Sequence, residues 1–411
     1  MNPEDLTPDE LHQLETLAEN APEPGIRQRA RLLLLYQQGL LTHQIARQVG
    51  LSRGRVRHWR GAFRRQGWSI FREFQPVEPA VIEEQLAPEA APAFLRFKAP
   101  GVLADDPMAE AGRKVLRFHF YQMLAHEQGT RLGEDIEELH DMRVATRRMR
   151  AAFEIFGDYF SRKAVKAHLR ALRSTGRSLG RVRDLDVFME KAVHYLDASH
   201  EDDRPGLEPL LHGWEAERES ARAEMLAHLD SQAYRQFVEN FGSFLETPGE
   251  GVRKLDSMAP QVTRHIAPTQ IYARLGAVRA YAALLDSASL EQLHGLRIQF
   301  KRLRYTLEYF REILGPEAKD VINEIKTIQD HLGDLNDANV ACQILNDFLS
   351  GWEARQLHLS LGSRQSTEPI VHYLAARHAE RHRLLVEFPT AWERFNRADV
   401  RLLLAQAVSI L

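Results

Sequence analysis

Cysteine is almost absent from this 411-residue chain. Cys342 is the single one, so no intramolecular disulfide can form and the sequence suits a reducing compartment. No apolar run approaches the ~20 residues that a membrane span needs, and the N-terminal residues 1–5 are acidic, unlike a secretory signal. A charge excess of one sign is lacking too, since the net charge is −3. We therefore predict a cytoplasmic protein with no membrane partner, in which any anion site comes from local segregation of charge.

Signatures of common enzyme classes are also missing. The chain has no P-loop, no Gly-x-Ser-x-Gly and no Ser-x-x-Lys. His378 and His382 are four residues apart, but the glutamate between them, Glu380, is misplaced for the zinc-protease pattern. No cofactor and no metal are expected. Sustained period-two alternation is absent as well, which predicts an all-α fold.

One segment is organised as a two-faced helix. At about 100° per residue, His140, Arg143, Arg147 and Arg150 fall in one narrow sector, which we call the first basic stripe. Apolar residues such as Met142 and Met149 fall on the opposite side. A lone stripe of this kind is usually a solvated face neutralised by acidic neighbours.

The pattern recurs later in the chain. The second basic stripe consists of His294, Arg297, Lys301 and Arg304, each 154 positions after its counterpart. Leu179-Gly180 with Arg183-Asp184 likewise precedes Leu332-Gly333 with Asn336-Asp337 by 153 positions. Two stripes in register predict an internal duplication of one helical unit, with repeat 1 at about 107–246 and repeat 2 at about 260–411.

The helix after the first stripe is expected over 165–179, with a new helix starting at Asp184. Arg170, Arg173 and Arg177 lie on one side of it. In repeat 2 their counterparts are Asn323, Lys326 and Asp330, so this helix is less symmetric. We expect Arg183, Asp184, Asp337 and Asn339 to act as caps and in intramolecular ion pairs, because carboxylates repel polyanions.

The N-terminal residues 1–75 are read as a separate helix-turn-helix domain. Thr7-Pro8-Asp9-Glu10 is a helix start, and a short helix, a turn at Gly50 and a second helix capped by Ser52 follow. Between residues 25 and 75 there are eleven arginines against Glu73, a local net charge of +10. This excess is typical of DNA binding, for which the candidates are Arg53, Arg55, Arg57, His58 and Arg60. Docking on protein or RNA is the alternative.

Residues 76–106 contain five prolines and are acidic, which predicts a linker. The expected architecture is thus a helix-turn-helix domain, a linker, and two pseudo-symmetric helical bundles over 107–411.

Two resemblances refine these expectations. Gln44-Ile45-Ala46, Gly50-Leu51-Ser52 and Val56-Arg57-His58-Trp59 resemble the homeodomain-like helix-turn-helix of transposases. Leu139-His140 and Leu293-His294 with the arginines and lysine that follow them, and Leu179-Gly180 with Arg183-Asp184, resemble the CHAD domain (conserved histidine α-helical domain). The second resemblance implies two bundles with a basic groove between them and inorganic polyphosphate as the ligand.

The resemblance assigns polyphosphate contacts to both stripes and to three outer residues. They are His140, Arg143, Arg147, Arg150, Arg173, Arg177, His294, Arg297, Lys301, Arg304 and Lys326. A linear polyanion needs many donors in a row, which two helical stripes supply. The acidic Glu-x-Glu-x-Lys motif of the triphosphatase tunnel, often found with CHAD domains, is absent. We predict a binding protein rather than an enzyme, with duplex DNA as a second partner and polyphosphate granules as a place of association.

Two other functions remain open from the sequence. One is a polyphosphate phosphohydrolase or phosphotransferase, and the other is a transcription regulator that senses a different polyanion. Neither resemblance fixes an oligomeric state.

Overall fold

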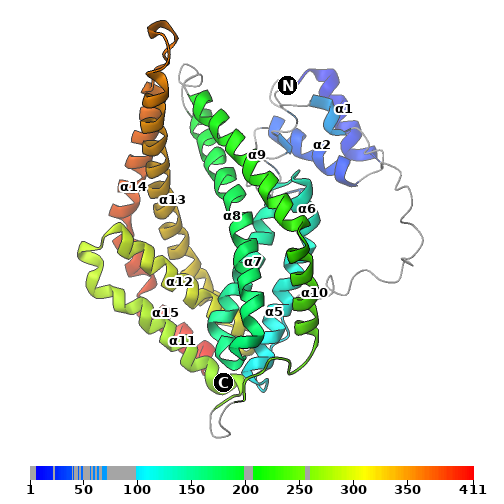
Figure 1. The fold of residues 1–411 in the computed structure, drawn as a ribbon, viewed down its shortest axis with the longest axis vertical. Helices are drawn as coiled ribbons and strands as arrows, with labels where there is room; N and C mark the ends of the chain where they lie inside the picture. Colours follow the sequence, from blue (N-terminus) through cyan, green and yellow to red (C-terminus); the bar gives the residue numbers. More distant parts are fainter. Residues whose placement is uncertain are drawn as a thin grey trace. The chain divides into compact units, whose positions relative to one another are not determined.

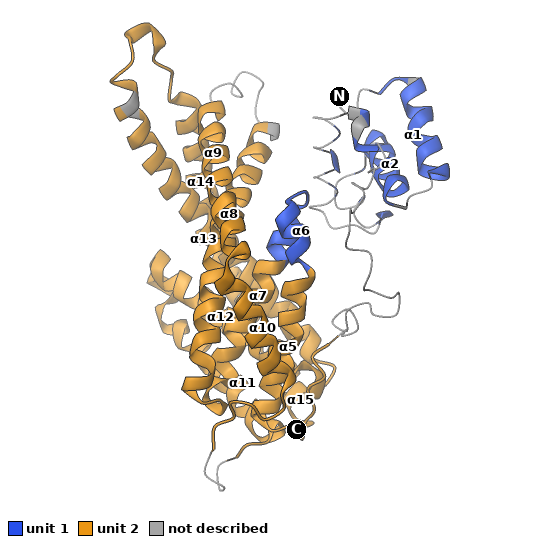
Figure 2. Cartoon of the chain, turned by 45° about the vertical axis from the view of Figure 1, so that its right-hand side comes forward, with its two compact units in different colours: residues 1–95, 126–141 blue, residues 96–125, 142–411 orange. Residues whose placement is uncertain are grey.

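The fold was analysed in a computed structural model. It describes residues 6–21, 24–38, 40, 45, 48–49, 56, 59–60, 63, 67–71, 99–198, 207–254 and 260–411. Over these residues it contains helices, two isolated β-bridges and no strand, so the all-α prediction is confirmed there. The chain separates into two compact units, residues 1–95 with 126–141, and residues 96–125 with 142–411 (Figure 2).

The first unit contains α1 (Pro8–Asn20), α2 (Pro24–Gln37), η1 (Gly67–Phe71) and α6 (Glu127–Leu132). Thr7 caps α1 as predicted: its side chain accepts from the Glu10 amide, and the Glu10 carboxylate accepts from the Thr7 amide at 2.8 Å. Leu14, Ile45, Val56 and Phe63 are fully buried in one core. These four side chains form part of the core of the first unit.

The second unit consists of two successive sets of helices (Figure 1). The first set is α5 (Met108–Ala125), α7 (Ile136–Phe156, whose residues from 142 belong here), η3 (Gly157–Tyr159), α8 (Arg162–Ala198), α9 (Glu208–Asp230) and α10 (Gln232–Glu246). The second set is α11 (Thr263–Arg279), η6 (Ala280–Ser287), α12 (Leu290–Phe310), η7 (Arg311–Ile313), α13 (Ala318–Gln356), η8 (Leu361–Ser363), α14 (Glu368–Phe395) and α15 (Ala398–Val408).

The bounds of matching helices agree closely. α7 and α12 are both 21 residues long, and their first and last residues differ by 154, the sequence offset of the stripes. The short helices η3 and η7 keep the same offset. The two sets differ where α9 and α10 are separated at Ser231, whereas α14 runs on through Pro389.

Contacts between the two sets include two that join positions 155 and 154 residues apart, close to or equal to the offset of the stripes. Pro107 and Val262 form an antiparallel bridge, in which the Met108 amide donates to the Gln261 carbonyl at 2.8 Å and the Thr263 amide donates to the Asp106 carbonyl at 2.9 Å. The rings of Phe156 and Phe310, 154 positions apart, lie with centroids 5.6 Å apart. Reciprocal contacts of this kind are the ones that a two-fold axis generates.

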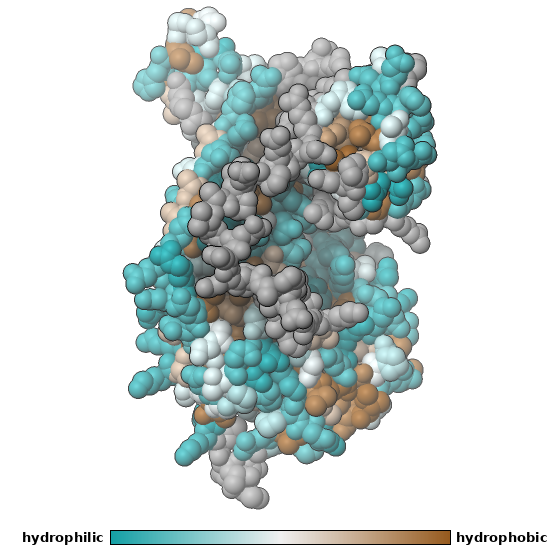
Figure 3. Space-filling view, turned by 90° about the vertical axis from the view of Figure 1, so that its right-hand side faces the viewer, coloured by the Kyte–Doolittle hydropathy of each residue, from teal (hydrophilic) through white to brown (hydrophobic). Residues whose placement is uncertain are grey.

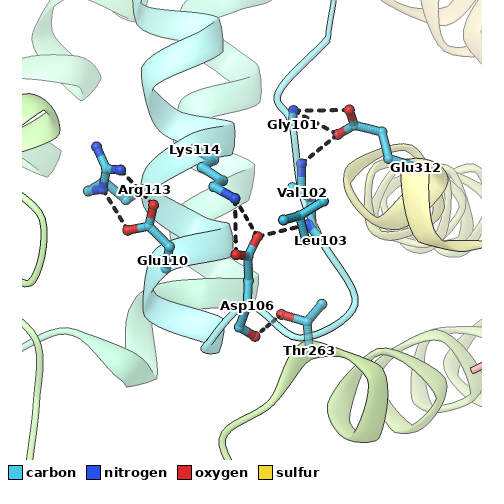
Figure 4. Close-up of polar contacts among 9 residues, drawn as sticks. All are labelled: Gly101, Val102, Leu103, Asp106, Glu110, Arg113, Lys114, Thr263 and Glu312. Carbon is cyan, nitrogen blue, oxygen red and sulfur yellow. Dashed lines mark hydrogen bonds and ion pairs between the residues drawn. The ribbon is translucent and has the colours of Figure 1, made fainter.

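The segment of residues 101–106, which precedes α5, forms hydrogen bonds with both sets of helices (Figure 4). The Glu312 carboxylate accepts from the amides of Gly101 at 3.0 Å and Val102 at 2.9 Å. Gly101 has φ 79°, a conformation that favours glycine. The Asp106 carboxylate accepts from Lys114 Nζ at 2.7 Å, and its carbonyl accepts from the Thr263 hydroxyl at 2.7 Å. The last residues of the predicted linker are thus bound to the second unit, while 76–98 lie outside the described residues.

One sequence expectation about the helices is wrong. The predicted break between residue 179 and Asp184 does not exist, because α8 continues unbroken for 37 residues. Gly180 lies inside this helix and is buried. The physical reason is packing: Gly180 is buried beside Arg143, with 3.5 Å between its β-carbon position and Arg143 Nε, and this packing outweighs the low helix propensity of glycine.

The described surface is largely hydrophilic in the view of Figure 3. In the part of the chain that the structure describes, no helix has the length and apolar character needed to cross a membrane.

Candidate functional site

The two basic stripes lie on α7 and α12 with the predicted orientation. Arg143 and Arg147 are half-buried on α7, while Met142 and Met149 on the opposite side are fully buried. His140, one turn earlier, is half-buried. On α12 His294 is exposed, Arg297, Lys301 and Arg304 are half-buried, and Leu296, Phe300 and Leu303 are fully buried. The predicted face assignment is confirmed for both helices.

Glycines on the neighbouring helices make room for two of the stripe arginines. A β-carbon at Gly180 would lie 3.5 Å from Arg143 Nε, and one at Gly333 would lie 3.8 Å from Arg297 Nε. The Leu-Gly pairs noticed in the sequence therefore provide flat surfaces against which the guanidinium groups lie. Both distances are ordinary van der Waals contacts, so these two glycines lie directly beside the guanidinium groups.

The two stripes converge around Lys301. Burial, together with the charges of Arg147, Arg297, Arg143 and Arg304, lowers the pKa of its ammonium group to about 8. Two of these arginines, Arg143 and Arg147, belong to α7, whereas Arg297 and Arg304 belong to α12. The second unit thus holds like charges from both halves close enough to disfavour one another.

Few acidic side chains pair with the cationic groups around Lys301. Among the described residues, Arg147, Arg297 and Lys301 form no ion pair, and the Nε atoms of Arg147 and Arg297 are buried without an acceptor. A buried donor without a partner costs about 1–3 kcal/mol. An anion that accepted from these donors would remove that cost.

Of the four residues expected to form caps and ion pairs, Asp184 and Asp337 form ion pairs. Asp184 pairs with Arg143 at 3.2 Å and Asp337 pairs with Lys191 at 3.3 Å, as expected of carboxylates beside basic stripes. Burial nevertheless lowers the pKa of Arg143 and raises the pKa of Asp184, against the attraction between them. This pair is therefore poorly solvated rather than strongly stabilising.

The cap part of that expectation is wrong, because Arg183 and Asp184 lie inside α8, and Asp337 and Asn339 inside α13. Asn339 Oδ1 accepts from Arg381 Nη1 at 3.0 Å. Arg183 is buried, forms no ion pair among the described residues, and leaves Nη1 without an acceptor.

The outer residues of the predicted site differ in accessibility. Arg150, Arg173, Arg177 and Lys326 are exposed. Arg304, by contrast, donates to Gln329 at 2.8 Å and to Glu308 at 3.1 Å. Its guanidinium is already hydrogen-bonded within the protein, so it contributes charge to the convergence with fewer donors left for a ligand.

Sequence reasoning missed a pair of reciprocal ion pairs between α7 and α12. Arg148 pairs with Glu308 at 3.0 Å, and Arg302 pairs with Glu154 at 3.1 Å. Each member lies 154 positions from its counterpart, so the two pairs join corresponding positions of α7 and α12 in reciprocal fashion. The uniform offset applied to Glu154 and Glu308 is the signal that would have found them.

The predicted DNA-binding residues lie mostly outside the described residues: Arg53, Arg55, Arg57 and His58 are among those not described. Arg60 is described, is half-buried, and places its guanidinium carbon 4.6 Å from the centroid of the Tyr36 ring. Packing on Tyr36 thus positions this arginine within the first unit.

Metal-binding groups do not gather in the described part of the chain, where no three His, Cys, Asp or Glu side chains are placed to hold an ion. His378 Nδ1 instead accepts from Arg381 Nη2 at 2.8 Å.

Comparison with known proteins identifies both parts of the chain. Residues 114–346 match the CHAD domain and residues 24–67 match the homeodomain-like domain. Uncharacterized proteins from two strains of Mycobacterium tuberculosis are 26% identical over 255 residues, 59% of this chain and 47% of the relative. The chain therefore spans about half the length of the curated relatives it matches.

Solved structures share the fold. The CHAD domain from the plant Ricinus communis aligns with a TM-score of 0.52 at 21% identity, over 75% of this chain and 94% of that one. PptA from Streptomyces chartreusis aligns with a TM-score of 0.50 at 16% identity, over 70% of this chain and 100% of that one.

Over the described residues, the fold and the site define a helical protein in which a helix-turn-helix-like region is followed in the sequence by two basic stripes. More particularly, the chain belongs to the CHAD domain family.

Proposed function

We propose that the second unit binds inorganic polyphosphate along the two basic stripes, within a groove between two bundles that arose by internal duplication. The observation that carries this proposal is the convergence on Lys301, where four arginines from two helices concentrate positive charge. The CHAD domain is a polyphosphate-binding family, which supports the choice among polyanions. Arginine forks give paired contacts to phosphate oxygens, and two helices present them in sequence along a chain-like ligand.

Binding rather than turnover is the role that we assign to this site. At pH 7 the side chains that converge on Lys301 are protonated, so they hold an anion as hydrogen-bond donors and positive charges rather than act as general bases. Release of phosphate from polyphosphate by the purified full chain with Mg²⁺ would contradict this assignment. In cells we propose a cytoplasmic protein that associates with polyphosphate granules.

The test of polyphosphate binding is a titration with chains of defined length at two salt concentrations. Binding through many phosphate contacts releases counterions, so affinity for long chains should fall steeply as salt rises, by analogy with nucleic acids. Triphosphate should bind far more weakly than long chains because it reaches fewer of the donors. Equal, salt-insensitive affinity for both ligands would replace the extended site with a compact pocket.

The depressed pKa of Lys301 predicts how binding depends on pH. With a pKa of about 8, Lys301 is charged at pH 7 and loses its proton as pH rises beyond 8. Its four charged neighbours are guanidinium groups, which keep their charge throughout. Polyphosphate affinity should therefore fall roughly tenfold between pH 7 and pH 10, the loss of about one charged hydrogen bond.

The matched variant for that measurement is Lys301→Arg, which keeps a positive charge over the whole range. It should flatten the pH profile measured by calorimetry. A profile that is unchanged in Lys301→Arg would assign the pH dependence to other groups.

We further propose that the homeodomain-like region binds duplex DNA through Arg53, Arg55, Arg57, His58 and Arg60. A local net charge of +10 and the match over residues 24–67 support this proposal. The full chain should shift duplex DNA in an electrophoretic assay at low salt. Absence of any shift would remove the DNA assignment.

Polyphosphate is itself a polyanion, so it could displace DNA by simple competition. The full-length variant with alanine at both Arg143 and Arg297 separates this from regulation. If the two units are coupled, polyphosphate should weaken DNA binding in the natural protein but not in the variant. Equal displacement in both proteins would leave competition as the explanation.

A further inference from the structure

The second set of helices contains a cavity that lies beside the polyphosphate site and shares His294 with it. It has a volume of about 420 Å³ and lies between the first turns of α12 and the middle of α13. Five aliphatic side chains form its apolar lining, and its polar lining is Glu291, His294, Asn336, Asn339 and Gln343. A mainly apolar space of this size with a few polar groups is typical of small-molecule sites.

The corresponding positions in the first half have different chemistry. At an offset of 153, Asn336, Asn339 and Gln343 replace Arg183, Asp186 and Glu190. In the first half Asp186 accepts from Arg218 at 2.5 Å, whereas in the second half Asn339 accepts from Arg381 at 3.0 Å. An arginine from the following helix is kept in both halves, but its partner has become neutral. Three charged side chains of the first half therefore correspond to amides that line the cavity in the second half.

The hydrogen bonds of these amides determine what they can offer a ligand. Asn336 Oδ1 accepts from His294 Nδ1 at 2.7 Å, and Asn339 Oδ1 accepts from Arg381. Each of these amides also carries an NH₂ group, which can donate to a ligand. Glu291 adds a carboxylate, which accepts only. Donors and an acceptor among aliphatic side chains suit a flat heterocycle that carries both kinds of group.

His294 connects this cavity to the basic stripe. It lines the cavity and is also the first member of the stripe on α12. At a rise of 1.5 Å per residue, Arg297 lies about 4.5 Å and Lys301 about 10.5 Å further along the helix. A ligand seated in the cavity therefore has cationic side chains directly beyond its edge, which fits a molecule with an uncharged head and an anionic tail.

We propose that this cavity takes the base of a purine nucleoside polyphosphate, whose phosphates lie on His294, Arg297 and Lys301. The asparagine N–H groups meet ring nitrogen and carbonyl acceptors, and Glu291 accepts from ring N–H and amino groups. Guanine offers two adjacent donors to one carboxylate, whereas adenine offers an amino group alone, so a guanine nucleotide is the preferred ligand. The proposal rests on the proposed function, since its phosphates use the same stripe.

The experiment is calorimetry on the full chain with GTP, ATP and tripolyphosphate, which share a triphosphate group, together with long-chain polyphosphate. GTP should bind at least tenfold more tightly than tripolyphosphate, with ATP between them. Gln343→Trp, which fills the cavity from an exposed position on α13, should abolish this advantage and leave tripolyphosphate affinity unchanged. Gln343→Ala, which opens the same position, should retain the advantage.

A second variant restores the chemistry of the first half. Asn339→Asp with Gln343→Glu places carboxylates in the cavity and should also remove the preference for GTP. Equal binding of GTP, ATP and tripolyphosphate by the natural protein would overturn the base site while leaving polyphosphate binding intact. Failure of all four ligands to bind would instead overturn the proposed function. A preference for ATP over GTP would overturn the assignment to guanine.

Discussion

Replacing Arg143 and Arg297 together by alanine should weaken polyphosphate binding by a factor of roughly 10² to 10⁴ while leaving the fold intact. Each arginine supplies charged hydrogen bonds, and losing one such contact costs about 1.5–3 kcal/mol. Both side chains lie against a glycine, Gly180 or Gly333, on the face opposite the buried methionines and leucines. Calorimetry with long-chain polyphosphate measures the loss, and circular dichroism with thermal melting checks the fold.

The control for this double variant removes the same charge elsewhere. Arg253 and Arg279 are exposed and lie outside both stripes, so alanine at these two positions should change affinity only slightly. Removing Arg143 also leaves Asp184 unpaired, so adding Asp184→Asn tests whether a bare carboxylate contributes to the loss. Wild-type affinity in the Arg143→Ala, Arg297→Ala protein would show that the ligand lies elsewhere.

Replacing Glu308 by alanine should destabilise the second unit by about 3–5 kcal/mol, the cost of leaving buried charges without their partner. The Glu308 carboxylate forms an ion pair with Arg148 at 3.0 Å and accepts from Arg304 at 3.1 Å, and its side chain is only 18% exposed. Alanine leaves both guanidinium groups uncompensated beside Arg147 and Lys301. Urea unfolding followed by far-UV circular dichroism would report the loss as a lower midpoint.

The chain provides its own matched control for Glu308. Glu154 is the equivalent residue 154 positions earlier, and it pairs with Arg302 at 3.1 Å. This pair is 51% and 39% exposed, so Glu154→Ala should cost less than about 1 kcal/mol. Equal losses for the two variants would contradict the view that burial, rather than the ion pair itself, sets the cost.

The orientation of the stripes could be predicted from the sequence because it depends only on helical periodicity. Arg143 and Met142 are adjacent residues whose opposite environments follow from about 100° per residue. The offset of 154 likewise predicted the matching bounds of α7 and α12. Local rules and repetition were sufficient for these features.

Tertiary packing accounts for what the sequence did not predict. The sequence predicts a helix end at residue 179, but Gly180 lies within α8, where it packs beside Arg143 from another helix. The bonding of Arg304 to Gln329 and Glu308 and the convergence on Lys301 depend on how α7, α12 and α13 pack. The cavity beside His294 has no motif of its own and is found only once α12 and α13 are placed together.

The reciprocal bridge of Pro107 and Val262 has a consequence for how the second unit holds together. Together with the contact of Phe156 with Phe310, it gives each half a surface shaped to receive its own equivalent. In a chain severed between residues 254 and 260, the two fragments would meet through an interface with the symmetry of a homodimer. The covalent connection acts as a tether that raises the effective concentration of one half for the other. Polyphosphate bound across both stripes, as proposed, would then be a second connection between the same two fragments, and one that can dissociate.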